Sequence, residues 1–151
     1  MQKIKFRYLA SIIKPNSRIL GIDYGLKKIG SAIFHNCIDN IIPLKVIRNF
    51  SSVYTIIEQL IKENTCIAVV IGISSGGRNT KDVIELQKTI QTNVFVPVFL
   101  QNEDLTTFSA NEILKELGVN YRRRNSVDDA IAAQLILESF MCDFKKYIRD
   151  K

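Results

Sequence analysis

Three acidic residues, Asp23, Glu103 and Asp129, stand at the ends of predicted strands or helices, where folding can bring carboxylates together. Asp23 ends the apolar run 19–22, Glu103 lies just past a strand predicted over 98–101, and Asp129 falls in the first turn of the last predicted helix. Converging carboxylates repel one another unless a hard cation lies between them, and Mg²⁺ or Mn²⁺ suits an oxygen-only site. Paired ions in such a site favour phosphodiester cleavage. The three acids therefore predict a catalytic, metal-binding group.

Each acid also has a simpler interpretation. Asp23 can accept backbone N–H bonds in the turn to Gly25, and Glu103 can be a solvated loop charge. Asp129 with Ser126 resembles a capping box, and an acid in a first turn interacts favourably with the helix dipole. Taken singly, none of these residues decides between metal ligation and a structural role.

The elements that would position these acids alternate between strands and helices. We predict strands over 18–23, 28–34, 42–47, 67–71 and 98–101 and helices over 52–62, 80–92, 106–118 and 126–140. This order predicts an α/β domain whose mixed five-stranded sheet begins as an antiparallel meander and continues with parallel strands, flanked by helices. Active sites of open α/β sheets form outside the carboxyl ends of the strands. The predicted topology can thus gather the three acids.

The chain of 151 residues, 46% of them hydrophobic, fits one globular domain. Residues 1–17 are interpreted as an N-terminal extension, 18–141 as the domain and 142–151 as a C-terminal tail. No apolar stretch is long enough for a membrane span, and the first residues lack the features of a secretory signal. Cys37, Cys66 and Cys142 form no CxxC pair, which favours free thiols and a cytoplasmic protein.

Basic residues give the chain a net charge of +6, from 21 basic and 15 acidic side chains. Lys27 and Lys28 lie close after Asp23, and Arg122-Arg123-Arg124 precede Asp129 in a predicted loop. Cations at these positions can bind a phosphate backbone, although a solvated charge run explains three consecutive arginines equally well. Tyr24 can stack on a base or pack in the core. The charge pattern indicates a nucleic-acid partner.

Three segments in one collinear order resemble the YqgF (RuvX) family of RNase H-like proteins, covering roughly residues 18–140. Leu20-Gly21-Ile22-Asp23-Tyr24-Gly25-Leu26-Lys27-Lys28-Ile29-Gly30-Ser31-Ala32 is similar to the first family motif, LGIDYGxKRIGxA. Glu103-Asp104-Leu105-Thr106-Thr107, with Ala110 and Leu114, is similar to DERLTTxxAxxxL. Asp129-Ala130-Ile131-Ala132-Ala133-Gln134-Leu135-Ile136-Leu137 is similar to the closing DxxAAxxIL.

The resemblance implies an RNase H-like fold in which Asp23, Glu103 and Asp129 bind Mg²⁺ or Mn²⁺. Asp128 is the alternative ligand if the last motif is shifted by one residue. The implied activity is processing of the 5′ end of the 16S ribosomal RNA precursor. The alternatives are cleavage of branched DNA as a Holliday junction resolvase, which normally needs a dimer, and metal-independent nucleic-acid or ribosome-assembly binding without catalysis. A monomer and a homodimer both remain open.

Two segments depart from the family pattern. The usual Asp-Glu-Arg is replaced by Asn102-Glu103-Asp104, and the loop 72–78 is shorter and lacks the usual Pro and Asp. The resemblance places that loop, including Arg78, against the substrate, and implies that Thr106 also contacts the nucleic acid. Substrate specificity or rate is therefore expected to differ from typical members.

Overall fold

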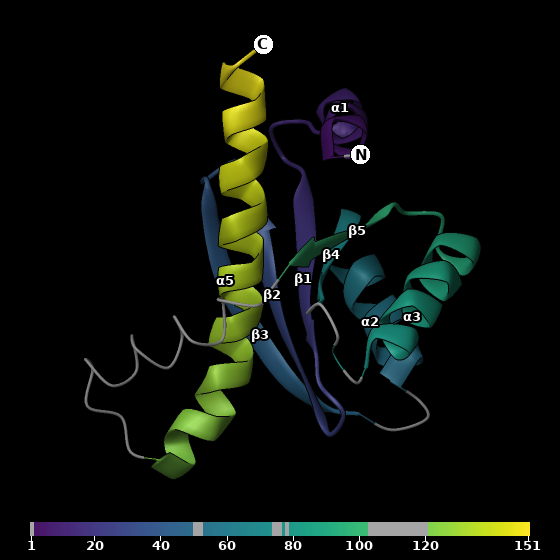
Figure 1. The fold of residues 1–151 in the computed structure, drawn as a ribbon, viewed down its shortest axis with the longest axis vertical. Helices are drawn as coiled ribbons and strands as arrows, with labels where there is room; N and C mark the ends of the chain where they lie inside the picture. The colour runs from purple at the N-terminus through teal and green to yellow at the C-terminus, as the bar shows by residue number, and fades with distance from the viewer. Residues whose placement is uncertain (1, 50–52, 74–76, 78, 103–120) are drawn as a thin grey trace.

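Five strands form one mixed sheet in the computed structural model (Figure 1), in the order β3-β2-β1-β4-β5. The strands are β1 (Arg18–Tyr24), β2 (Lys28–His35), β3 (Asn40–Arg48), β4 (Cys66–Ile73) and β5 (Val98–Asn102). The pairs β1–β2 and β2–β3 are antiparallel, whereas β1–β4 and β4–β5 are parallel. The predicted antiparallel meander followed by parallel strands is confirmed, and each strand extends one to three residues beyond its predicted range.

The structure describes residues 2–49, 53–73, 77, 79–102 and 121–151, and for residues 2 and 121–130 it describes the backbone only. Its helices are α1 (Gln2–Ile12), α2 (Val53–Glu63), α3 (Thr80–Asn93) and α5 (Tyr121–Arg149). The helix predicted over 106–118 lies outside the described residues. Among the described helices, none is both long enough and apolar enough to cross a membrane.

The sheet is covered on both faces, so the core has two halves. Helices α2 and α3 pack on one face with side chains such as Leu20 and Ile22, and α1 and α5 pack on the other face with Ile19 and Ala32 (Figure 1). Strand β4 alternates between the halves, with Val69 in the first and Val70 in the second. This two-sided burial explains its continuous apolar sequence.

Helix α5 is longer than predicted at both ends. The sequence predicted a loop over 121–125 and a helix over 126–140, but the structure has one helix from Tyr121 to Arg149. The helix start predicted from the capping signal at Ser126 was therefore wrong. Neither Gly nor Pro interrupts this segment, and a buried stripe continues past the predicted end through Phe140 and Phe144. Packing of that stripe on the sheet stabilises the longer helix.

Helix α1 lies within the segment interpreted from the sequence as an N-terminal extension. Helix α1 buries Phe6 and Leu9 against α5, and the Phe6 ring lies 5.4 Å from Phe140 and 5.8 Å from both Phe144 and Tyr147, measured between ring centroids. An isolated helix of 11 residues is marginal in water, so its stability comes mainly from this packing. Helix α1 and the C-terminal part of α5 thus both belong to the helical layer on this face of the sheet.

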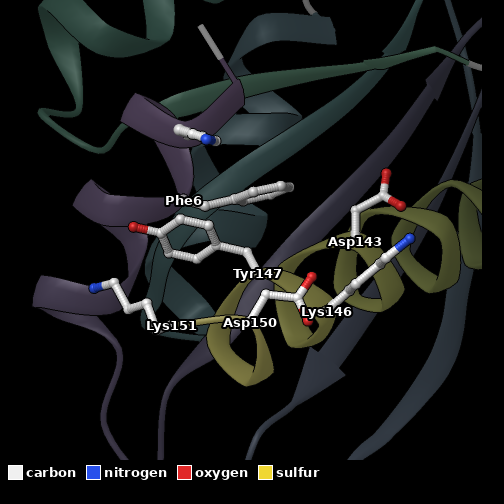
Figure 2. Close-up of a pocket in the computed structure, with 7 residues that line it drawn as sticks. Phe6, Asp143, Lys146, Tyr147, Asp150 and Lys151 are labelled. Carbon is white, nitrogen blue, oxygen red and sulfur yellow. The ribbon is translucent and has the colours of Figure 1, made fainter.

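A pocket lies between α1 and the C-terminal end of α5 (Figure 2). Its wall includes the Phe6 and Tyr147 rings, and Asp143, Lys146, Asp150 and Lys151 line its polar side. In Figure 1, α1 and the end of α5 lie at one end of the molecule, whereas the β1–β2 hairpin lies at the other. The pocket is therefore remote from the end of β1.

The three cysteines differ in burial, and this gives a chemical test of the fold. Cys66 is buried at the start of β4, and burial raises the pKa of its thiol to about 12, whereas Cys37 and Cys142 are exposed. We expect iodoacetamide at pH 8 to alkylate Cys37 and Cys142 rapidly and Cys66 only after unfolding, as measured by peptide mass spectrometry. Alkylation of Cys66 in the native protein at the rate of Cys142 would contradict its burial.

The same pKa shift predicts a loss of stability at alkaline pH. The Cys66 thiol ionises near the ordinary pKa of 9.0 in the unfolded chain, but its pKa is about 12 in the fold. Its contribution to stability is therefore present below pH 9 and is lost as the pH rises towards 12. Denaturant unfolding at a series of pH values measures this loss of unfolding free energy. In Cys66→Ala, the loss between pH 9 and pH 12 should be smaller than in the wild type.

Candidate active site

Asp23 lies near the end of β1 on the face covered by α5. Gly21, two residues earlier on the same face, lies so close to α5 that a Cβ there would be 2.4 Å from Leu137 Cγ and 3.2 Å from the Ala133 carbonyl oxygen. Ile19 belongs to the same half of the core. Asp23 is half-buried. The structure thus places a carboxylate on the α5 face at the predicted edge of the sheet.

The contact at Gly21 fixes the position of α5 along β1. Asp129 precedes Ala133 by about one helical turn, or roughly 6 Å along the axis, and Asp23 follows Gly21 by roughly 7 Å along the strand. Helix α5 runs opposite to β1 (Figure 1), so both steps lead towards the same end of the sheet. The backbone of Asp129 is therefore expected at the level of Asp23.

The third predicted ligand, Glu103, lies outside the described residues, as do Arg78 and Thr106. It follows Asn102, the last residue of β5. Two residues before Glu103, Gln101 faces α5 and donates through Nε2 to Ser139 Oγ at 3.0 Å and to Asp143 Oδ2 at 3.3 Å. Gln101 of β5 thus contacts the same helix, at residues 10 and 14 positions after Asp129.

The predicted site residues of α5 are described by their backbone alone. Asp129 and the alternative ligand Asp128 lie in the N-terminal part of this helix, as do the arginines 122–124, which were predicted to lie in a loop. That part of α5 lies at the end of the molecule that holds the β1–β2 hairpin (Figure 1). Among the side chains that the structure describes, no three His, Cys, Asp or Glu residues gather as metal ligands.

The turn between β1 and β2 presents Lys27 and Lys28, which are both exposed. Gly25 donates its N–H to the Lys28 carbonyl at 3.0 Å, and a Cβ at Gly25 would lie 2.4 Å from that oxygen. Only glycine therefore fits this tight turn. Asn49 donates through Nδ2 to the Gly25 carbonyl at 2.7 Å and ties the turn to the end of β3.

Tyr24 packs against the half of the core formed with α2 and α3, on the opposite face from Asp23. Its carbonyl accepts a hydrogen bond from the Asn79 side chain at the start of α3. Stacking of Tyr24 on a base stays a prediction.

Arg48 is a basic residue of this region that the sequence motifs did not indicate. It ends β3 and is the cross-strand partner of Lys28. The predicted topology could have indicated this residue, because a meander of three strands brings the end of the third strand beside the start of the second. Arg48, Lys27 and Lys28 line one shallow hollow together with Leu26 and Asn49.

The strand order, the two helical layers and the acid near the end of β1 define an RNase H-like protein. Solved structures agree with this class. The fowlpox virus Holliday junction resolvase has a TM-score of 0.53 and 17% identity, covering 83% of this chain and 98% of that one. RuvC of T. thermophilus, in complex with a Holliday junction substrate, has a TM-score of 0.52 and 14% identity, covering 84% of this chain and 95% of that one. These similarities establish the fold.

Sequence comparison identifies the family. The family model RuvX, described as Holliday junction resolvase, matches residues 17–143. Curated relatives named "Putative pre-16S rRNA nuclease" include one from Rickettsia typhi, 34% identical, covering 90% of this chain and 92% of the relative. A relative of the same name from Rickettsia bellii is 34% identical, covering 89% of this chain and 92% of the relative. The chain belongs to the RuvX family, which confirms the resemblance found in the sequence motifs.

Proposed function

We propose that this protein is a divalent-metal-dependent nuclease that processes the 5′ end of the 16S ribosomal RNA precursor in the cytoplasm. The observation that carries the proposal is the close packing of α5 on Gly21, which leads both Asp23 and Asp129 towards one end of the sheet. The names of the curated relatives support the ribosomal substrate.

Asp23, Glu103 and Asp129 would bind Mg²⁺ or Mn²⁺. The half-buried Asp23 carboxylate fits this role, because a hard cation prefers oxygen ligands and offsets the cost of burying the charge. When bound, such ions supply charge neutralisation at the scissile phosphate and a more acidic water. The protein itself would contribute the placement of Asp23, which is paired with Gly30 of β2 directly after the residues of β1 that pair with β4.

Cations around the site would bind the nucleic-acid backbone. Lys27 and Lys28 present exposed charges beside the end of β1, and the arginines 122–124 lie in the first turns of α5. Such contacts supply affinity that depends on salt and not on sequence. Arg78 and Thr106 are proposed as further contacts on the resemblance alone.

The test is cleavage by purified protein of a labelled 16S rRNA precursor fragment and of a labelled four-way DNA junction. Each substrate is incubated with Mn²⁺, with Mg²⁺ and with EDTA. We expect Mn²⁺- or Mg²⁺-dependent cleavage near the mature 5′ end of the rRNA, and no cleavage in EDTA.

Two other outcomes correspond to the alternative functions. Symmetric cleavage of the junction by a dimer, with the rRNA left intact, would establish a resolvase, the activity in the description of the family model. RNA binding that is unaffected by EDTA, without cleavage under either ion, would establish a non-catalytic binding protein. Sedimentation of the same samples distinguishes a monomer from a homodimer.

A further inference from the structure

Lys28 and Arg48 lie on the same face of the sheet as Asp23. Asp23 is paired with Gly30 across β1 and β2, and Lys28 is two residues before Gly30 in β2. Arg48 is paired with Lys28 across β2 and β3. Paired residues, and residues two apart in a strand, share a face. Both cations therefore lie on the α5 face, at the end of the sheet where β1 brings Asp23.

The pairing of Lys28 with Arg48 is unfavourable for the fold alone. Like charges directly opposite one another on antiparallel strands are destabilising. In the described part of the chain, no acidic side chain forms an ion pair with Lys28 or Arg48. Lys27 adds a third exposed cation to the same hollow. An anion bound between the three side chains would relieve their repulsion.

The backbone around these cations is held in place by specific hydrogen bonds. Asn49, next to Arg48, donates its N–H to the Lys27 carbonyl at 2.8 Å and its side-chain Nδ2–H to the Gly25 carbonyl at 2.7 Å. Ser31 fills the shift in register between β2 and β3, since its Oγ donates to the Lys45 carbonyl at 2.7 Å and accepts from the Lys45 N–H at 3.2 Å. The three cations are thus presented from a defined framework.

We propose that Lys27, Lys28 and Arg48 form a phosphate clamp that holds the nucleic-acid backbone beside the active site. This inference rests on the proposed function and adds Arg48, at the end of β3, as a binding residue. From two strand spacings and two residues along the strand, the Cα atoms of Arg48 and Asp23 lie about 12 Å apart. The clamp therefore binds a backbone phosphate that is close to the scissile one but distinct from it. Arg48 is suited to this because its guanidinium can bind two phosphate oxygens.

The test is the affinity of Arg48→Gln for a fluorescein-labelled 20-nucleotide RNA, measured by anisotropy in EDTA over a range of salt concentrations. We expect Kd to rise about 3- to 10-fold at 100 mM salt and the slope of log Kd against log salt to fall by about 0.7, because one phosphate contact is lost. Arg48→Glu pairs an acid with Lys28, so we expect it to bind RNA more weakly still and yet to unfold at the same or a higher temperature.

Lys88→Gln is the matched control, since it removes one exposed cation from α3 on the opposite face. If Arg48→Gln has the same RNA affinity and the same salt slope as Lys88→Gln, the clamp is overturned. A melting temperature below that of the wild type for both Arg48 variants would also overturn it. The assay contains no divalent ion and does not depend on cleavage. Loss of affinity in Arg48→Gln without any nuclease activity would reject the proposed function alone, whereas cleavage with unchanged Arg48→Gln affinity would reject the clamp alone.

Discussion

Asp23→Asn is expected to reduce Mn²⁺-dependent cleavage at least on the order of 10²–10³-fold, because it would remove a charged ligand from the proposed metal site without changing the shape of the side chain. The fold is expected to survive. Asp23 is near the end of β1 and half-buried, and asparagine keeps both its size and its capacity to accept hydrogen bonds. The melting temperature in EDTA should therefore change little.

Metal binding can be separated from catalysis by the melting temperature with and without Mn²⁺. A ligand that binds the folded state raises the melting temperature of the wild type, and this increase should shrink in Asp23→Asn. Asp82→Asn is the control, because it makes the same chemical change at an exposed position in α3. Full cleavage by Asp23→Asn, or an undiminished Mn²⁺ effect on its melting temperature, would reject Asp23 as a ligand.

The sheet could be predicted from sequence because its signals are local. Each strand is a short apolar run between turn residues, and the non-alternating run around Val69 and Val70 indicated a strand covered on both faces. The position of Asp23 followed from the same alternation. The assignment of Glu103 and Asp129 from the motifs stays a prediction, because their side chains lie outside what the structure describes.

The helices at the two ends of the chain could not be predicted in the same way. Helix α1 is stabilised by Phe6 packing on Phe140, a contact between residues far apart in the sequence. The start of α5 was misplaced because Ser126 carries a local capping signal, which continuous helix formation from Tyr121 overrode. The proximity of Arg48 to Lys28 was not predicted for a related reason, since it depends on pairing with another strand.

Gly21→Ala is expected to destabilise the fold by about 1–3 kcal/mol, because the added methyl overpacks a filled interface. The new Cβ would lie 2.4 Å from Leu137 Cγ and 2.7 Å from Leu137 Cδ1, so the buried leucine must move. The Ala133 carbonyl oxygen would lie 3.2 Å from the new Cβ, so the backbone of α5 also limits the space at this position. If α5 shifts, Asp129 shifts with it, and a displacement of about 1 Å in the proposed site can cost on the order of 10²-fold in rate. Thermal unfolding and Mn²⁺-dependent cleavage measure the two effects.

A double-mutant cycle with Leu137→Ala isolates the contact between β1 and α5. Leu137→Ala alone leaves a cavity and should cost about 2–5 kcal/mol. In the double variant the methyl group added by Gly21→Ala occupies part of that cavity, so the combined loss should be smaller than the sum of the single losses. Additive losses, or an unchanged melting temperature in Gly21→Ala, would mean that α5 does not pack against Gly21 in solution. The expected alignment of Asp129 with Asp23 would then lose its support, because that alignment is measured from this contact.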